Sequence, residues 1–346
     1  MKRYIRTDLA LELKEDLPEQ GLIDGVKIFT KNYKDEDIKE TIIEVVNKNG
    51  EMLLGKPVGT YVTIESKSLR EGDDSINKSF MQILHHNLAK MIGKADKIMV
   101  IGLGNRAITP DSLGPLVIDN LYITRHLINE GLVKEDKELS ALAPGVMAQT
   151  GIETSVIIKS VCDKVKPDVV IAIDALAARE PDRLNSTIQI CDTGINPGAG
   201  VGNNRAKLDK KTLGVKVIAI GVPTVISVPA IVYQSVEGMV NVLRGEVGKS
   251  SETKDNKKNK SKEYNGRNNK NNDKTKDTDE EKNRGTDDED RLDRFTDAEK
   301  YEIACNLLEP DLAAMFVTPK NIDEAVKRVS YTISEAINGF LNYKRN

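Results

Sequence analysis

Apolar residues recur in this chain with two spacings, which predict strands that alternate with helices. Several runs are almost continuously apolar and rich in Val and Ile, such as KIMVIG at 97–102 and DVVIAI at 168–173, and such runs are typical of strands buried on both faces. Segments with apolar residues every three or four positions lie between them and predict helices. Because strands that alternate with helices usually pair in parallel, we predict an α/β fold with a mostly parallel central sheet flanked by helices. The predicted strands are 97–104, 138–144, 168–175, 187–193 and 215–222, and the predicted helices between them are 110–132 and 151–165.

Smaller elements are predicted on the N-terminal side of this sheet. Two short strands are expected at 26–30 and 59–66. Between them apolar residues recur every four positions from 38 to 46, which is the spacing of one helix face. We therefore predict a small α+β subregion, followed by an amphipathic helix at 74–91.

The composition changes abruptly at 249–294, where almost every residue is Lys, Asn, Asp, Glu, Ser or Thr. Such a segment buries too little apolar surface to offset the entropy of ordering, so we predict a disordered polar insertion. A last amphipathic helix follows the insertion. Thr318 is its predicted N-cap and Pro319 its first residue.

Composition and charge narrow the possible functions. The chain of 346 residues carries a net charge of −3 and only 4% aromatic residues, so direct nucleic-acid binding is not expected. Its three cysteines, Cys162, Cys191 and Cys305, form no CxxC pair, which predicts neither a disulfide framework nor a zinc cluster. No window approaches the roughly 18 apolar residues of a membrane span. We therefore expect a cytoplasmic protein without a membrane segment.

Two of the predicted strands run out into a single aspartate, Asp111 after 97–104 and Asp174 at the end of 168–175. Open α/β sheets bind ligands at the carboxyl ends of their strands. Two carboxylates held there share a proton, so that one pKa rises while the other group stays ionised. Such a pair can activate a water and protonate a leaving group. We predict Asp111 and Asp174 as a catalytic pair, with Asn105 as polar support.

Each of these signals has an alternative. The GxGxxA pattern at 102–107 matches a dinucleotide fingerprint, but the next helix is predicted to start several residues too late for its first amides to meet a pyrophosphate. Asp111 considered alone could simply cap that helix. Asp174 could have a structural role as the partner of Arg179 or Arg183.

A glycine-rich loop, NPGAGVGNN, follows the strand at 187–193. Its glycines let the backbone pass close to a substrate chain, although a tight turn explains them equally well. A phosphate cradle is a third alternative, but no GK[ST] accompanies the loop. We predict Gly198, Gly200 and Gly202 as substrate-binding residues.

Six motifs together resemble the spore germination endopeptidase family. They are RTDLALE at 6–12, GLGNRAITPDSLGP at 102–115, APGVMAQTGIET at 143–154, IDALAAR at 173–179, PGAGVGN at 197–203 and AIGVPTV at 219–225. The resemblance implies a fold similar to that of the hydrogenase maturation proteases, in the phosphorylase/hydrolase-like group, and an atypical aspartic mechanism unrelated to that of pepsin. The family's TPD and IDA motifs place its proposed catalytic aspartates on Asp111 and Asp174.

The resemblance also implies a substrate, an assembly and a maturation step. Family members degrade small acid-soluble spore proteins in the spore core, as homotetramers made as zymogens. They cut after an acidic residue that precedes a large apolar residue and Ala, a pattern that this chain carries at 7–10. We therefore expect self-cleavage between Asp8 and Leu9. The expected organisation is a propeptide at 1–8, one peptidase domain formed by 9–248 and 295–346, and the insertion at 249–294.

Two other functions are left open by the sequence. A metal-assisted protease of the maturation type is the nearest alternative, although no suitably placed histidine supports it and no cofactor is predicted. A non-catalytic binder of spore proteins or DNA is the other, for which the basic first half of 249–294 is the support.

Overall fold

The computed structural model describes residues 7–15, 24–33, 37–72, 74–134, 137–202, 205–243 and 297–341. Within these ranges nine strands form one sheet in the order β1-β2-β3-β7-β8-β6-β4-β5, and β9 pairs with β8. The strands are β1 (Val26–Tyr33), β2 (Ile38–Val45), β3 (Gly59–Glu65), β4 (Lys97–Gly102), β5 (Glu138–Leu142), β6 (Val169–Ala178), β7 (Thr187–Cys191), β8 (Lys216–Ser227) and β9 (Phe316–Val317). The helices are α1 (Ala10–Glu15), α2 (Lys48–Leu54), α3 (Lys67–Glu71), α4 (Asp74–Ile92), α5 (Leu113–Asp119), α6 (Arg125–Asn129), α7 (Met147–Thr150), α8 (Thr154–Val165), α9 (Lys210–Leu213), α10 (Val228–Leu243), α12 (Asp297–Leu307), α13 (Pro310–Ala313) and α14 (Ile322–Asn338), with the 3-10 turns η1 (Thr109–Asp111) and η2 (Pro181–Arg183).

The α/β class with a helix-flanked central sheet is confirmed, but the sheet is mixed and not mostly parallel. Strands β5, β4, β6 and β8 pair in parallel, whereas β8, β7, β3, β2 and β1 pair antiparallel. Only the short segment with η2 separates β6 from β7. A return in the same direction needs a crossover of a dozen residues or more, which this connection is too short to supply.

The N-terminal subregion is part of the same sheet, and the amphipathic segment predicted there is a strand. Residues Ile38–Val45 pair with β1 on one side and β3 on the other. Thr41, Ile42, Ile43 and Val45 are β-branched, which lowers their preference for a helix and suits a pleated strand. The fourfold spacing of apolar residues was therefore the weaker signal in this segment.

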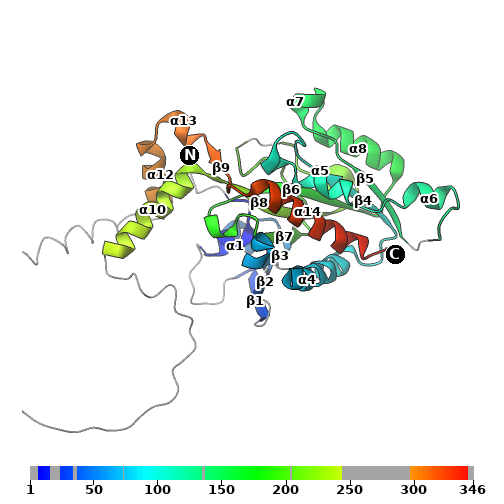
Figure 1. Ribbon diagram of the computed structural model, residues 1–346, viewed down its shortest axis with the longest axis horizontal. Helices are drawn as coiled ribbons and strands as arrows, with labels where there is room; N and C mark the ends of the chain where they lie inside the picture. The colour runs from blue at the N-terminus through cyan, green and yellow to red at the C-terminus, as the bar shows by residue number, and fades with distance from the viewer. Residues whose placement is uncertain are drawn as a thin grey trace, which may run out of the picture. The chain divides into compact units, whose positions relative to one another are not determined.

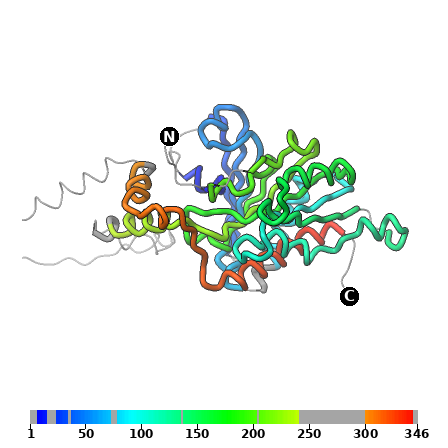
Figure 2. Tube along the Cα trace, turned by 90° about the horizontal axis from the view of Figure 1, so that it is seen from above, coloured from blue at the N-terminus to red at the C-terminus, as the bar shows by residue number. Residues whose placement is uncertain are grey.

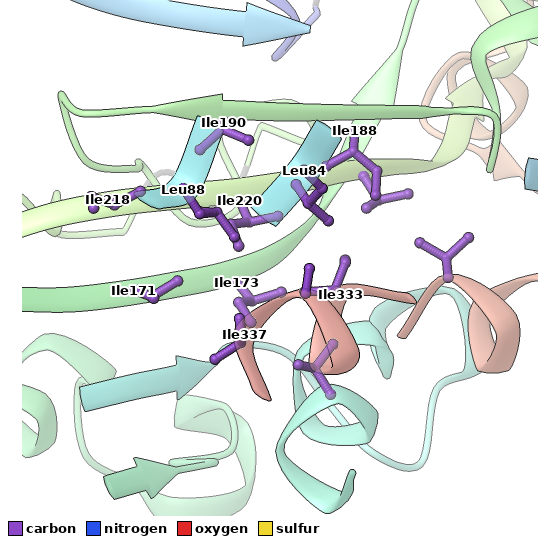
Figure 3. Packing of buried hydrophobic residues seen from close by; sticks show 14 of the residues in the cluster. Leu84, Leu88, Ile171, Ile173, Ile188, Ile190, Ile218, Ile220, Ile333 and Ile337 are labelled. Carbon is purple, nitrogen blue, oxygen red and sulfur yellow. The ribbon is translucent and has the colours of Figure 1, made fainter. Parts of the chain in front are cut away.

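Helices cover both faces of the sheet, and the alternation of side chains along each strand decides which layer a residue contacts. In β6, Ile171 and Ile173 join the cluster formed with α4, α5 and α14, whereas Val170 and Ala172 join a second cluster with α8 and α9. Figure 3 shows Ile173 facing Ile333 and Ile337 of α14, and Figure 1 places α14 beside α4.

Two predicted helices have other bounds in the structure, while the helix predicted at 74–91 is confirmed as α4. The segment 110–132 contains α5 and α6, separated where the Thr124 hydroxyl donates to the Lys137 carbonyl oxygen and accepts from the Leu139 N–H. The last helix has Asn321 as its N-cap residue. Thr318 is not its N-cap, because its hydroxyl donates to the Thr224 carbonyl oxygen at 2.8 Å.

The chain divides into two compact units. The smaller contains residues 232–308, and in its described part Lys300 of α12 pairs with Glu237 of α10 at 2.8 Å. The larger contains residues 5–231 and 309–346, with the whole sheet and every predicted site residue. The predicted insertion at 249–294 and residues 1–6 of the predicted propeptide lie outside the described residues. The domain limits 9–248 and 295–346 stay a prediction.

Candidate active site

Asp111 is carried over the end of β4 by a tight glycine turn. Gly104 has a φ of +111°, and a Cβ there would lie 2.0 Å from the Asp111 carbonyl oxygen. The Asn105 N–H donates to Asp111 Oδ2 at 2.7 Å. Asp111 ends the turn η1 and does not lie in the first turn of α5, which begins at Leu113. Burial raises the pKa of Asp111, and the Asn105 hydrogen bond opposes this rise.

Asn105 links this turn to a neighbouring segment. Its side-chain oxygen accepts from Gln149 Nε2 at 2.7 Å and from the Ala107 N–H at 3.0 Å. Asn105, predicted as polar support, thus stabilises the turn through its side chain, and its backbone N–H binds the Asp111 carboxylate.

Asp174 lies within β6 and not at its end, since the strand continues to Ala178. The neighbouring strand β4 stops at Gly102, which pairs with Ile173. Asp174 therefore comes directly after the last pair of β6 with β4. The residue is 5% exposed, and its side chain accepts a hydrogen bond from the Ala175 N–H at 3.0 Å. Burial raises its pKa well above the usual range, and the negative charges of Asp111 and Asp8 raise it further.

The two arginines considered as partners of Asp174 instead bind glutamates. Arg183 contacts Glu12 at 3.2 Å, Glu15 at 2.5 Å and Glu65 at 3.2 Å. Arg179 lies 3.7 Å from Glu15. Within the described residues, Asp174 has no ion pair, so the structural alternative loses its partners.

The N-terminal segment 7–15 brings a third carboxylate to the site. Helix α1 lies against β2 and β3 (Figure 2), and Leu9 at its start is fully buried. The Asp8 N–H donates to the Ala177 carbonyl oxygen at 3.2 Å, and the Ala177 N–H donates to Asp8 Oδ2 at 3.1 Å. Burial raises the pKa of Asp8, and the Ala177 hydrogen bond opposes it.

One cavity of about 440 Å³ brings most of the predicted residues together. Asp8, Asp111, Asp174 and Asn105 line it, as do Gly198 and Gly200 of the glycine-rich loop. A Cβ on Gly200 would lie 2.1 Å from Asp8 Oδ2, so this position needs glycine for the close approach of the carboxylate. Gly202, by contrast, is not among the lining residues and adopts a φ of +77° in a turn.

Within the described ranges, no group of three or more His, Cys, Asp or Glu side chains has the arrangement to hold a metal ion. His85 contacts the Ala336 carbonyl oxygen and stacks on Phe340. Cys162 and Cys191 are buried, as expected for packed cysteines. None of the helices in these ranges has the length and apolar character needed to cross a membrane.

An α/β sheet that presents two electrostatically coupled carboxylates to a cavity has the features of an acid–base enzyme. Residues 7–346 match the germination protease family, and the chain belongs to that family. Membership makes the chain an endopeptidase of spore germination, which confirms the resemblance drawn from the six motifs.

Two of the relatives below match nearly the whole chain, and a third matches two thirds of it. The germination protease of Caldanaerobacter subterraneus subsp. tengcongensis is 38% identical over 339 residues, covering 96% of this chain and 93% of the relative. That of Bacillus subtilis is 38% identical over 360 residues, covering 98% and 94%. That of Bacillus pumilus is 44% identical over 247 residues, covering 67% and 66%. Among solved structures, a NiFe hydrogenase maturation protease from Thermococcus kodakarensis is 22% identical, with a TM-score of 0.28, over 40% of this chain and 80% of that chain.

Sequence reasoning missed two residues that contact the predicted cleavage site, Lys56 and Gln189. Both donate hydrogen bonds to the Asp8 carbonyl oxygen. Neither lies in a motif quoted above, and Gln189 is 181 positions from Asp8 in the sequence. A polar residue in the apolar strand TIQIC was the one local signal that could have pointed to Gln189.

Proposed function

We propose that this endopeptidase degrades small acid-soluble spore proteins in the spore core, cutting after an acidic residue that precedes a large apolar one, with Asp111 and Asp174 as the catalytic pair. The observation that supports this most is that Asp8, the acidic residue before the expected cut, lines the same cavity as both aspartates. The proposal includes a zymogen that cuts itself between Asp8 and Leu9, and a homotetramer, as the family resemblance implies.

The environments of the two aspartates suggest a division of roles. Asp174 is the more buried of the two and has two carboxylates as neighbours, so it keeps a proton at higher pH. Asp111 accepts the Asn105 N–H, which favours its ionised form. The pair titrates as a coupled unit. We therefore assign Asp111 as the general base and Asp174 as the general acid.

The reaction then balances with one water. Asp111 takes a proton from the water while the water oxygen forms a bond to the Asp8 carbonyl carbon. Asp174 donates its proton to the Leu9 nitrogen as the carbon–nitrogen bond breaks. The products are a carboxyl group on Asp8 and a free amino group on Leu9, and a proton passing from Asp111 to Asp174 resets the pair.

Intact-mass measurement of the full chain after mild acidification tests the proposal. The wild-type chain is expected to lose residues 1–8, whereas D111N and D174N are expected to stay whole. D163N is a matched control, because Asp163 is a surface carboxylate paired with Lys159. A new terminus anywhere other than Leu9, or cleavage by either Asn variant at the wild-type rate, would refute it.

Two further measurements separate the proposal from its alternatives. Incubation with a small acid-soluble spore protein, followed by mass mapping, should show cuts after Glu or Asp before a large apolar residue. A metal-assisted protease would lose activity in EDTA, whereas the aspartate pair is expected to keep its rate.

A further inference from the structure

Two side chains from distant parts of the chain converge on one carbonyl oxygen. Lys56 Nζ donates to the oxygen of Asp8 at 2.9 Å, and Gln189 Nε2 donates to the same oxygen at 3.2 Å. Lys56 follows α2, whose end is set by Gly55 in the left-handed conformation, and Gln189 lies in the middle of β7. This oxygen belongs to the peptide bond that the proposed self-cleavage breaks.

Gln189 also holds the chain on the other side of that bond. Its Oε1 accepts the Ala10 N–H at 2.6 Å, so both ends of its amide group are satisfied. The Asp8 N–H is bound by the Ala177 carbonyl oxygen at 3.2 Å. Hydrogen bonds thus hold the chain on both sides of the peptide bond between Asp8 and Leu9, as they would hold a bound substrate chain.

The strand register places Gln189 in the same row as Asp174. Asp174 of β6 pairs with Gly221 of β8, and Gly221 pairs with Gln189 of β7. Residues paired in this way point to the same face of a sheet, and neighbouring strands lie about 4.8 Å apart. Asp174 and Gln189 therefore lie in one row two strands apart, with a glycine between them.

The ammonium group of Lys56 has an unusual environment. Burial lowers its pKa, the charges of Asp8, Cys191 and Glu12 oppose this, and Lys207 adds to it. In the part of the chain that the structure describes, Lys56 has no ion pair. A half-buried cation directed at a neutral carbonyl is costly in the ground state, and its interaction strengthens when that oxygen becomes negative.

We propose that Lys56 and Gln189 bind the oxyanion that forms on the scissile carbonyl, and that Gln189 also positions the substrate chain by accepting the Ala10 N–H. This inference rests on the proposed function, because it takes the Asp8–Leu9 bond as the one that is cut. Attack of water moves the carbonyl electron pair onto the oxygen, and the two donors already lie at hydrogen-bond distance from it. When the carbon–nitrogen bond breaks, the carbonyl re-forms and the donors return to their first state.

The test measures the rate of self-cleavage of the full chain by intact mass. Removal of one such donor typically lowers a rate by about 100- to 1,000-fold, so K56M and Q189L are each expected to lose about 100-fold or more. K56Q keeps a neutral donor and is expected to fall between K56M and the wild type. K207M removes a nearby positive charge that does not contact the carbonyl, and its rate is expected to stay within about threefold of the wild type.

Hydrogen exchange distinguishes catalysis from simple anchoring. In a D174N background, which stays uncut, K56M should leave exchange of the peptide covering residues 7–15 close to that of D174N alone. The inference is overturned if K56M and Q189L cut within about threefold of the wild-type rate. It is also overturned if the slower cut of K56M comes with faster exchange in 7–15, because the segment has then left the site. Thermal melts confirm that each variant folds, and K56Q takes the place of K56M if K56M does not.

Failure of the proposed function gives a different result. If the wild-type chain does not cut between Asp8 and Leu9, or if D111N and D174N cut normally, the aspartate mechanism fails whatever the Lys56 variants do. If the aspartate variants are inactive and the Lys56 and Gln189 variants are not, only the present inference fails.

Discussion

Replacement of Asp174 by Asn is expected to stabilise the folded protein while it abolishes cleavage. Asp174 is 5% exposed as a residue, and within the described residues its carboxyl group has one hydrogen bond and no cationic partner. D174N keeps an oxygen that accepts the Ala175 N–H and needs no proton on folding, because an amide is neutral at every pH. An incompletely satisfied buried polar group costs about 1–3 kcal/mol. A gain of about 2 kcal/mol at neutral pH would raise Tm by about 3 °C for a chain of this size.

The sign of the pH dependence follows from the raised pKa of Asp174. The folded state binds this proton more tightly than the unfolded chain, in which an Asp has a pKa of about 3.9. The contribution of Asp174 to stability therefore falls as pH rises from the unfolded value to the folded one, and stays low above it. The Tm advantage of D174N should therefore be larger at about pH 7.5 than at about pH 4.

Calorimetry of the wild type, D174N and the surface control D163N at both pH values measures this difference. Intact mass before and after each scan ensures that the wild-type chain has not cut itself. D111N/D174N should gain less than the sum of the single variants, because each removes the charge that opposes the other. A lower Tm for D174N at neutral pH, or the same gain at both pH values, would refute the electrostatic reasoning.

Two further predictions concern the scaffold. G104A should destabilise the protein by about 2 kcal/mol, because the residue has a φ of +111° and its Cβ would meet the Asp111 carbonyl oxygen at 2.0 Å; it should also slow self-cleavage. G131A, with a φ of +69° and nothing within 4 Å, should cost about 1 kcal/mol and leave cleavage unchanged. R183M removes the cation shared by Glu12, Glu15 and Glu65 and should lower the free energy of unfolding in urea by about 3–5 kcal/mol. K159M, which breaks a surface ion pair, should lower it by less than about 0.5 kcal/mol. Equal losses for the members of either pair of variants would contradict the corresponding argument.

The parts of the fold that the sequence could predict depend on local signals. Continuous apolar runs located β4, β6 and β8, because strands covered on both faces need apolar residues at every position. The late helix start after Gly104 argued against a dinucleotide site, and in the structure Gly104 has a positive φ in the turn that carries Asp111. Asp174 follows such a run directly and Asp111 follows another after a short loop, so their neighbourhood could be inferred from strand direction.

The errors arose where tertiary contacts decide between similar local patterns. The fourfold spacing at 38–46 fits a helix, but pairing with β1 and β3 buries Ile43 and Val45 in a strand. The helix predicted at 110–132 ends at Asp119, and Asn338 of α14 then binds the Tyr122 N–H and the Asn120 carbonyl oxygen. The local sequence indicates neither the strand pairing nor the Asn338 hydrogen bonds, because the partners are distant in the sequence.

The oxyanion-binding pair shows why the rest of the site could not be predicted. Gln189 reaches the Asp8 carbonyl only because β7 turns back antiparallel to β8, with a register that pairs Gln189 with Gly221. A shift of that register by one residue would turn Gln189 to the opposite face and bring Ile188 or Ile190 into its place. The apolar pattern of TIQIC resists such a shift, since Ile188 and Ile190 are fully buried in the cluster with α4 and α14 (Figure 3). The packing of one face of β7 thus fixes the position of a polar group on the other face. The aspartates lie in motifs that local sequence can indicate, whereas this donor depends on the whole sheet.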